Sequence, residues 1–222
     1  MDKKVKEIIN NEMRGFIFDL DGTLLDSIWV WKEIDLRFLG KRGIEVPDDY
    51  MEAVSPLGAT KTAEYTIERF NLDDKPEELI QEWFDMAIDA YRDEVECKPF
   101  AKKYVLKLKE SGKKLAVATS SDRQLIIPAL ERLEILDMFD TVVTVDEVER
   151  GKGFPDIYEK AARDMEIDNS ACVVFEDILA GIKGAKMGGF MAVGIYEANS
   201  ENEHTEMREL ADDFITGFDE LM

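Results

Sequence analysis

The chain has 222 residues, of which 45% are hydrophobic and 35% are charged, and its formal net charge is -21. This length and apolar content fit one core domain that carries an insertion. The negative field disfavours nucleic acid and anionic lipid as partners, no run approaches the ~20 apolar residues of a membrane span, and we therefore expect a cytoplasmic protein.

An apolar run near the N-terminus ends abruptly in two carboxylates. Gly15 to Phe18 has the aromatic and β-branched composition of a strand buried on both faces, and Asp19 and Asp21 follow it. Both carboxylates would leave the same sheet edge before a turn at Gly22. Because two such close negative charges repel unless a cation lies between them, the pair predicts a divalent metal, most simply Mg2+. The alternative is a strand followed by an ordinary Asp-Gly turn.

The next segment has helical periodicity in place of strand composition. We expect four helices, at 28–40, 48–53, 60–70 and 77–93. The apolar stripe of the first helix would consist of Ile28, Trp31, Ile34, Phe38 and Leu39. An all-helical block of this size predicts a small cap domain, residues 28–94, inserted into a core domain of residues 1–27 and 95–222.

The rest of the chain alternates between strands and helices. We expect strands at 115–118, 141–145, 172–175, 191–195 and 213–215, with helices at 100–111, 123–134, 156–166 and 178–187. β-branched strands bounded by short polar loops are typical of a parallel sheet covered on both faces. The predicted fold is therefore α/β, a Rossmann-like sheet with helices on both sides.

Three further strand ends carry side chains suited to phosphate chemistry, since ligands collect at the carboxyl ends of strands in open α/β sheets. Thr119 and Ser120 could cradle phosphate oxygens, or could simply cap the following helix. Lys152 lies between two glycines in an acidic segment and is either a site residue or a surface lysine. Glu176 and Asp177 form a second acid pair, which again suggests a cation.

Taken together, these pieces match a known family. The run from Phe18 to Ser27, Phe-Asp-Leu-Asp-Gly-Thr-Leu-Leu-Asp-Ser, resembles the first motif of the haloacid dehalogenase superfamily, and the other three clusters follow in the order of its remaining motifs. The resemblance covers roughly residues 14–27 and 95–196. The helical insertion is similar to the four-helix cap of the β-phosphoglucomutase and phosphoglycolate phosphatase branch.

The resemblance implies a role for each matching residue. Asp19 would be the nucleophile that forms an aspartyl-phosphate, and Asp21 the acid and base. Thr119, Ser120 and Lys152 would grip the phosphoryl oxygens. The ligands of Mg2+ would be Asp19, Asp21 through its backbone carbonyl, Glu176 and Asp177.

Further contacts to substrate are expected from the first motif and from the cap. Leu20 and Gly22 would contribute to substrate or phosphate binding. In the cap, Trp29 and the loop of residues 55–61, including Lys61, would face the leaving group as the cap closes. Trp31 is a further candidate, but because it fits the apolar stripe it could equally pack in the cap core.

The choice of reaction depends on a few positions. Asp21 disfavours a dehalogenase, and neither Lys32 nor Lys61 is marked as the desolvated lysine that a phosphonatase needs. A mutase of the β-phosphoglucomutase type would have a histidine soon after Ser27, which this chain lacks, and a Lys-Asn pair where Asp122 and its neighbouring arginine stand.

The expected function is therefore Mg-dependent hydrolysis of a small phosphomonoester, a sugar phosphate or similar metabolite, by a monomer or weak dimer. The alternatives are phosphoglucomutase-type phosphoryl transfer and a non-catalytic module that binds a metabolite. The single histidine, His204, lies outside all four motifs and is expected to take no part.

Overall fold

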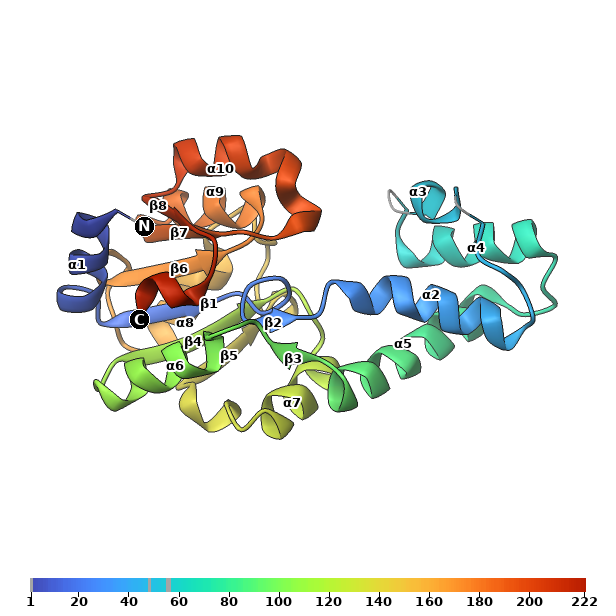
Figure 1. Cartoon of the computed structure of the whole chain (residues 1–222), viewed down its shortest axis with the longest axis horizontal. Helices are drawn as coiled ribbons and strands as arrows, with labels where there is room; N and C mark the ends of the chain where they lie inside the picture. The colour runs from blue at the N-terminus through green and yellow to red at the C-terminus, as the bar shows by residue number, and fades with distance from the viewer. Residues whose placement is uncertain (1, 48, 55–56) are drawn as a thin grey trace. The chain divides into compact units, whose positions relative to one another are not determined.

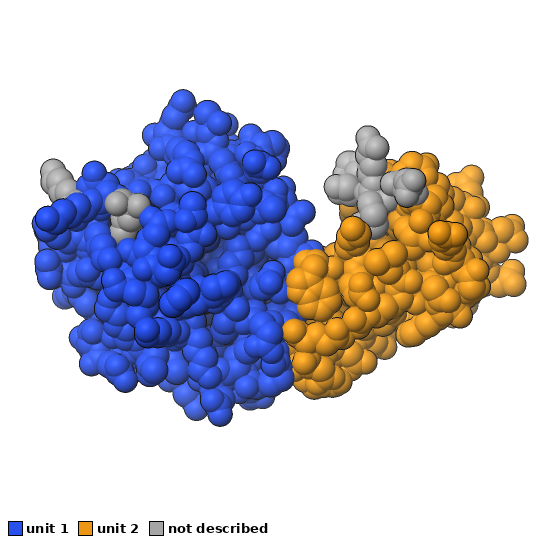
Figure 2. All heavy atoms as spheres, in the orientation of Figure 1, with its two compact units in different colours: residues 1–28, 95–222 blue, residues 29–94 orange. Residues whose placement is uncertain are grey.

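The computed structural model describes residues 2–47, 49–54 and 57–222, and the chain splits into two compact units (Figures 1 and 2). Unit 1 comprises residues 1–28 and 95–222, and unit 2 comprises residues 29–94. Ser55 and Pro56 of the predicted cap loop lie outside the described residues. No described helix has the length and apolar character needed to cross a membrane.

Unit 1 is built on a six-stranded sheet in the order β5-β4-β1-β6-β7-β8, and every neighbouring pair is parallel. Its strands are β1 (Gly15–Phe18), β4 (Lys114–Thr119), β5 (Thr141–Thr144), β6 (Cys172–Glu176), β7 (Met191–Ile195) and β8 (Asp213–Ile215). The predicted strands are all present, with ends shifted by at most one residue. The predicted parallel α/β fold is confirmed.

One helix of unit 1 precedes the first strand and the others lie between strands along the chain, as Figure 1 shows. They are α1 (Lys3–Asn11), α6 (Ala101–Glu110), α7 (Arg123–Arg132), α8 (Asp156–Asp164), α9 (Leu179–Met187) and α10 (His204–Leu210). Short 3-10 turns lie at η1 (Leu136–Met138), η2 (Val145–Glu147), η3 (Asn169–Ala171), η4 (Ala198–Glu203) and η5 (Phe218–Leu221). The helix predicted to run to residue 134 ends earlier, because Glu134 has a left-handed backbone with φ 56°.

Both faces of the sheet are covered, because successive strand residues point to opposite sides. Ile17 of β1 faces a core formed with α8, α9 and α10. Phe18 faces the other side, where its ring stacks on Phe175 of β6 with centroids 4.9 Å apart. Tyr104 of α6 and Phe218 of η5 complete this aromatic cluster. The aromatic composition of the first strand thus reflects one of the two buried faces.

A two-stranded ribbon joins the segments through which the chain leaves unit 1 and returns to it. β2 (Leu25–Asp26) pairs antiparallel with β3 (Glu96–Cys97). The sequence analysis did not predict this ribbon, because two residues are too few to show a periodicity. The ribbon keeps the two ends of the insertion side by side.

Unit 2 contains α2 (Trp29–Lys41), α3 (Tyr50–Val54), α4 (Ala59–Phe70) and α5 (Pro76–Asp93). In α2 the buried residues are Val30, Ile34, Phe38 and Leu39. The prediction that Trp31 belongs to the buried stripe is wrong: the stripe advances by four residues from Val30, and Trp31 is 50% exposed on the neighbouring face.

Truncation of Phe175 to alanine tests the aromatic cluster. Because this fully buried ring contacts several others, its loss should lower the free energy of unfolding by about 3–5 kcal/mol. Urea denaturation followed by circular dichroism measures the change. The control Leu106→Ala removes a side chain that is 41% exposed and should stay within about 0.5 kcal/mol of wild type. Equal losses in the two variants would contradict the assignment.

Candidate active site

The two acid pairs approach each other because the strands that carry them are neighbours. β1 and β6 run in parallel register, with Phe18 opposite Phe175. The Asp19 N–H donates to the Phe175 carbonyl at 3.0 Å, so Asp19 and Glu176 leave adjacent strands at the same edge. Asp19, Glu176 and Asp177 each offer a carboxylate oxygen, and these oxygens lie within 4.8 Å of one another. The structure thus brings three of the predicted metal-binding residues together.

Lys152 provides a cation at this cluster. Its ammonium lies 2.8 Å from Glu176 Oε1 and also contacts Asp19 Oδ1. Its loop approaches α9 closely because Gly184 has no side chain, and a Cβ at that position would overlap the Lys152 carbonyl. The side chain is buried, which rules out the alternative of a surface lysine. It also means that Glu176 has a basic neighbour that the local sequence did not indicate.

One lysine does not neutralise three carboxylates. With all four groups ionised, the cluster carries two excess negative charges, and burial makes such an excess costly. A divalent cation would restore neutrality, and hard cations prefer oxygen ligands of this kind. Glu176 Oε2 supports this fit, since it is buried and no described group donates a hydrogen bond to it. The donor set therefore fits Mg2+.

Burial also raises the pKa of all three carboxyl groups. At Asp19, the effect of burial on the pKa outweighs the opposing charge of Lys152. Burial raises the pKa of Glu176 to about 7 and that of Asp177 to about 9, and the neighbouring carboxylates act in the same direction. Burial alone would lower the pKa of Lys152, but the charges of Asp19 and Glu176 raise it. Burial and the mutual repulsion of the carboxylates thus favour their protonated forms when no divalent ion is bound.

Tyr158 is a site residue that the sequence analysis missed. Its hydroxyl donates to Glu176 Oε1 at 2.7 Å, and it is fully buried on α8. Burial raises the pKa of this phenol well above its usual value, and the charge of Glu176 adds to the effect. Tyr158 therefore remains a neutral donor that orients Glu176. This contact was not predicted, because it depends on the approach of α8 to β6, which the sequence does not show.

Asp21 lies in a different setting from Asp19. Its carboxylate is half-buried and accepts hydrogen bonds from Ser27 and Ser121, each at 2.5 Å. Thr119 is buried, and its hydroxyl accepts from the Ser121 N–H at 3.0 Å. Ser120, which was expected to bind phosphate, is exposed beside it. The prediction for Ser120 concerned its main-chain N–H, which the exposure of the side chain does not affect, while the contact of the Ser121 hydroxyl with Asp21 was not predicted because it depends on the loop conformation.

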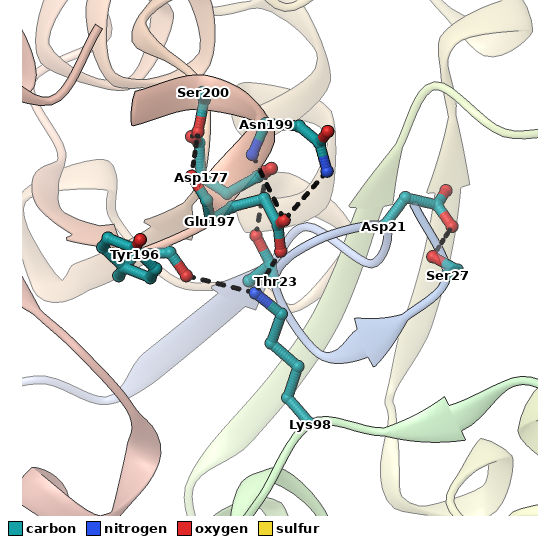
Figure 3. A network of polar contacts seen from close by, with 9 residues as sticks. All are labelled: Asp21, Thr23, Ser27, Lys98, Asp177, Tyr196, Glu197, Asn199 and Ser200. Atoms are coloured by element: carbon teal, nitrogen blue, oxygen red, sulfur yellow. Dashed lines mark hydrogen bonds and ion pairs between the residues drawn. The ribbon is translucent and has the colours of Figure 1, made fainter. Parts of the chain in front are cut away.

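The turn after Asp21 brings the first motif against the second acid pair. Gly22 has a φ of 80°, and a Cβ there would overlap Asp177 Oδ2. The Thr23 hydroxyl donates to Asp177 Oδ1 at 3.2 Å, as Figure 3 shows. Leu20 is fully buried, and its carbonyl accepts from the Thr23 and Leu25 N–H groups. Leu20 and Gly22 thus shape the turn that brings Thr23 to the Asp177 carboxylate.

Unit 2 holds the predicted cap residues and a cavity of its own. The cavity has a volume of about 420 Å³, and Trp31, Asp35 and Trp83 are among its lining side chains. Trp29, which was preferred over Trp31 as a substrate contact, is half-buried, and Lys61 is exposed in the first turn of α4. Burial raises the pKa of Asp35 to about 6.

Comparison with known proteins places these features in context. A family model described as haloacid dehalogenase-like hydrolase matches residues 16–195. Fructose-1-phosphate phosphatase YqaB from Escherichia coli (strain K12) is 31% identical over 181 residues, covering 82% of this chain and 95% of the relative. Beta-phosphoglucomutase from Bacillus subtilis (strain 168) is 30% identical over 196 residues, covering 82% and 83%.

A solved structure shares the fold. The crystal structure of CbbY from Rhodobacter sphaeroides in complex with phosphate has a TM-score of 0.73 and 21% sequence identity, and the match covers 94% of this chain and 96% of that chain. At this level of identity the likeness concerns the fold.

Replacement of Asp35 by asparagine should change how stability depends on pH. A carboxyl whose pKa is raised on folding contributes its full stability below about pH 4, and loses it as the pH rises through about 6. Relative to wild type, Asp35→Asn should therefore gain about 1–2 kcal/mol between pH 4 and pH 8, less than the full shift implies because the group is partly solvated.

Urea denaturation followed by tryptophan fluorescence measures this change, since the three tryptophans of the chain, Trp29, Trp31 and Trp83, all lie in unit 2. The control Asp73→Asn removes an exposed carboxylate from the same unit and should show no such gain. A pH dependence that is the same in both variants would show that burial of Asp35 is not its cause.

Proposed function

Since the chain belongs to the haloacid dehalogenase-like hydrolase family, as the sequence motifs predicted, we propose that it is a phosphatase that hydrolyses a small phosphomonoester. The observation that carries this proposal is the buried contact of Lys152 with Asp19 and Glu176, beside an intact Asp21. The names of two relatives refer to phosphorylated sugars, which favours a sugar phosphate as the substrate class.

Asp19 is the proposed nucleophile. A carboxylate oxygen attacks the phosphorus, the bond from phosphorus to the ester oxygen breaks, and an aspartyl-phosphate forms. Asp21 gives its proton to the departing alcohol oxygen, then takes a proton from the water that attacks the intermediate. Inorganic phosphate leaves, and the Asp19 carboxylate is restored. The serine hydroxyls on Asp21 support this role, since they fix the direction of its carboxylate without neutralising it.

Lys152 and the β4 loop are the proposed phosphate contacts. The Lys152 ammonium already balances negative charge at Asp19 and would also stabilise the oxygens of the transferring phosphoryl group. The Thr119 hydroxyl ends β4 at the same sheet edge, and the main-chain N–H of Ser120 follows it there, where an anion can be bound. These local donors counter the repulsion that a protein of net charge -21 exerts on a phosphorylated substrate.

The proposed ligands of Mg2+ are the carboxylates of Asp19, Glu176 and Asp177, with the Asp21 carbonyl as a fourth. When bound, the ion would neutralise nucleophile and phosphate, so that one anion can approach another. The chain's own residues prepare this site, because Tyr158 orients Glu176 and Thr23 orients Asp177.

Phosphoryl transfer between positions of a sugar is the second candidate, since one relative is a beta-phosphoglucomutase. Two departures from the sequence pattern of the β-phosphoglucomutase type favour hydrolysis. No histidine stands soon after Ser27, and the helix after the β4 loop begins with Asp122 as its N-cap followed by Arg123, which binds Glu147. A third candidate, a module that binds phosphate without turnover, would have no need of the Asp21 acid.

Two substitutions in the first motif test the phosphatase. With p-nitrophenyl phosphate and Mg2+, Asp19→Asn should lower kcat about 10³-fold or more, because it removes the attacking oxygen. Asp21→Asn should lower kcat for a sugar phosphate by about 10²–10⁴-fold, and less for p-nitrophenyl phosphate, whose leaving group needs little protonation. Chelation of divalent metal should abolish both activities. Phosphate release measures turnover on each substrate.

The matched control is Asp137→Asn, which removes an exposed carboxylate from η1 and should leave kcat unchanged. Wild-type turnover no greater than that of Asp19→Asn would refute the proposal that the chain is a phosphatase. Conversion of β-glucose 1-phosphate to glucose 6-phosphate without net phosphate release would favour the mutase. A panel of sugar phosphates, phosphoglycolate and nucleoside monophosphates would identify the substrate.

A further inference from the structure

Lys98 lies where the chain has just returned to unit 1. It follows β3 directly, and its N–H donates to the Leu24 carbonyl at 2.8 Å, which fixes it against the segment that leaves unit 1. Its side chain then reaches the loop after β7. The ammonium lies 2.6 Å from Glu197 Oε2 and 3.1 Å from the Tyr196 carbonyl, as Figure 3 shows.

Glu197 is in turn connected to the second acid pair. Its carbonyl accepts from both the N–H and the hydroxyl of Ser200, at 3.1 and 3.2 Å. The same hydroxyl donates to the Asp177 carbonyl at 2.7 Å. The Glu197 side chain also lies beside Gly22. A Cβ on residue 22 would be 3.3 Å from Glu197 Cγ and would overlap the Asp177 carboxylate. Glu197 and Asp177 therefore both pack against the position that a side chain at residue 22 would occupy.

The pair of Lys98 and Glu197 is largely shielded from water, with 15% and 12% of the two side chains exposed. Burial opposes ionisation of Glu197, but the hydrogen bond and the charge of Lys98 outweigh it and lower the pKa of the carboxyl. The Glu197 carboxylate therefore forms an ion pair with the Lys98 ammonium. An ion pair in this setting resists displacement, because moving either partner leaves the other poorly solvated.

We propose that Lys98 and Glu197 are positioning residues that hold the Asp177 carboxylate and the Gly22 turn in the arrangement that binds the divalent ion. They contact neither the cluster oxygens nor the proposed phosphate site; they act through Ser200 and Gly22. This inference rests on the proposed function only in that the acidic cluster binds metal.

If the pair of Lys98 and Glu197 only stabilised the fold, its removal would affect stability and not metal binding. Thr23 is a single neutral donor to Asp177 at 3.2 Å, which is a weak restraint for a carboxylate beside two others. The ion pair adds a second restraint, because it fixes Glu197, which contacts the Gly22 turn and, through Ser200, the Asp177 carbonyl. If it were only a stabilising contact, its loss would lower the melting temperature without changing how tightly the folded protein binds metal. If it positions Asp177, metal affinity falls in the folded protein.

The test is a metal titration of Lys98→Met, Glu197→Gln and the double variant. Mn2+ binding to the full-length, metal-free chain, followed by electron paramagnetic resonance, needs no turnover. We expect each single variant to bind Mn2+ about 10-fold or more weakly, in the range seen when partners of metal ligands are removed. The Mg2+ concentration for half-maximal activity should rise by a similar factor, while kcat at saturating Mg2+ changes little.

The double variant separates positioning from stability. It leaves no unpaired charge, so its melting temperature should recover relative to Lys98→Met, while Mn2+ affinity stays weak. Glu197→Gln keeps an acceptor for Asn199, so a folded variant is available even if Lys98→Met is unstable. The matched control is Lys186→Met, which breaks a pair of 2.6 Å with Asp212 at the amino end of β7 and should leave Mn2+ binding unchanged.

Mn2+ affinity of folded Glu197→Gln within twofold of wild type would overturn the proposal, whatever happens to the melting temperature. So would a wild-type protein that binds no Mn2+. A wild type that binds Mn2+ but releases no phosphate would refute the phosphatase alone, whereas an active wild type with unchanged affinity in the variants would refute only the positioning role.

Discussion

The ammonium of Lys152, buried between Asp19 and Glu176, is the interaction on which the rest of the site depends. A charge at this depth is tolerated only with charged partners, and the partners here exceed it in number. Their excess negative charge calls for protons or for a divalent ion. The site therefore contains more carboxylates than ammonium groups, and the hydrogen bonds of neighbouring residues keep these carboxylates close together despite their repulsion.

The two aspartates of the first motif show how environment separates roles in one short segment. Asp19 ends a buried strand and faces other ionised groups, whereas Asp21 is half-buried and held by two hydroxyls. Two carboxyl groups that differ only in surroundings can serve as nucleophile and as proton carrier. Gly22 follows both of them, and its left-handed conformation belongs to the turn that brings Thr23 to the Asp177 carboxylate.

The sequence predicted the architecture well because the strands are short, apolar and separated by polar loops. Asp19 and the pair at the end of β6 could be placed at one sheet edge, since each follows an apolar run, whereas Lys152, between two glycines in an acidic segment, was placed with them through the family resemblance. Prediction from the sequence failed where the contact depends on loop conformation or on distant parts of the chain. The contacts of Ser121 with Asp21 and of Tyr158 with Glu176 were not predicted, because each requires the approach of segments far apart in the chain. Trp31 was assigned to the wrong face, because its spacing fits two stripes of the same helix.

The position of β1 in the sheet has a consequence for synthesis on the ribosome. This strand lies between β4 and β6, and Gly15 pairs with Lys114 on one side and Cys172 on the other. The nascent chain thus delivers β1 well before its partners β4 and β6, and the whole of unit 2 emerges in the interval. Unit 2 can begin to fold before the sheet around β1 forms. Until β4 and β6 have been synthesised, β1 is an unpaired apolar segment, and ribosome-associated chaperones would have to protect it from aggregation.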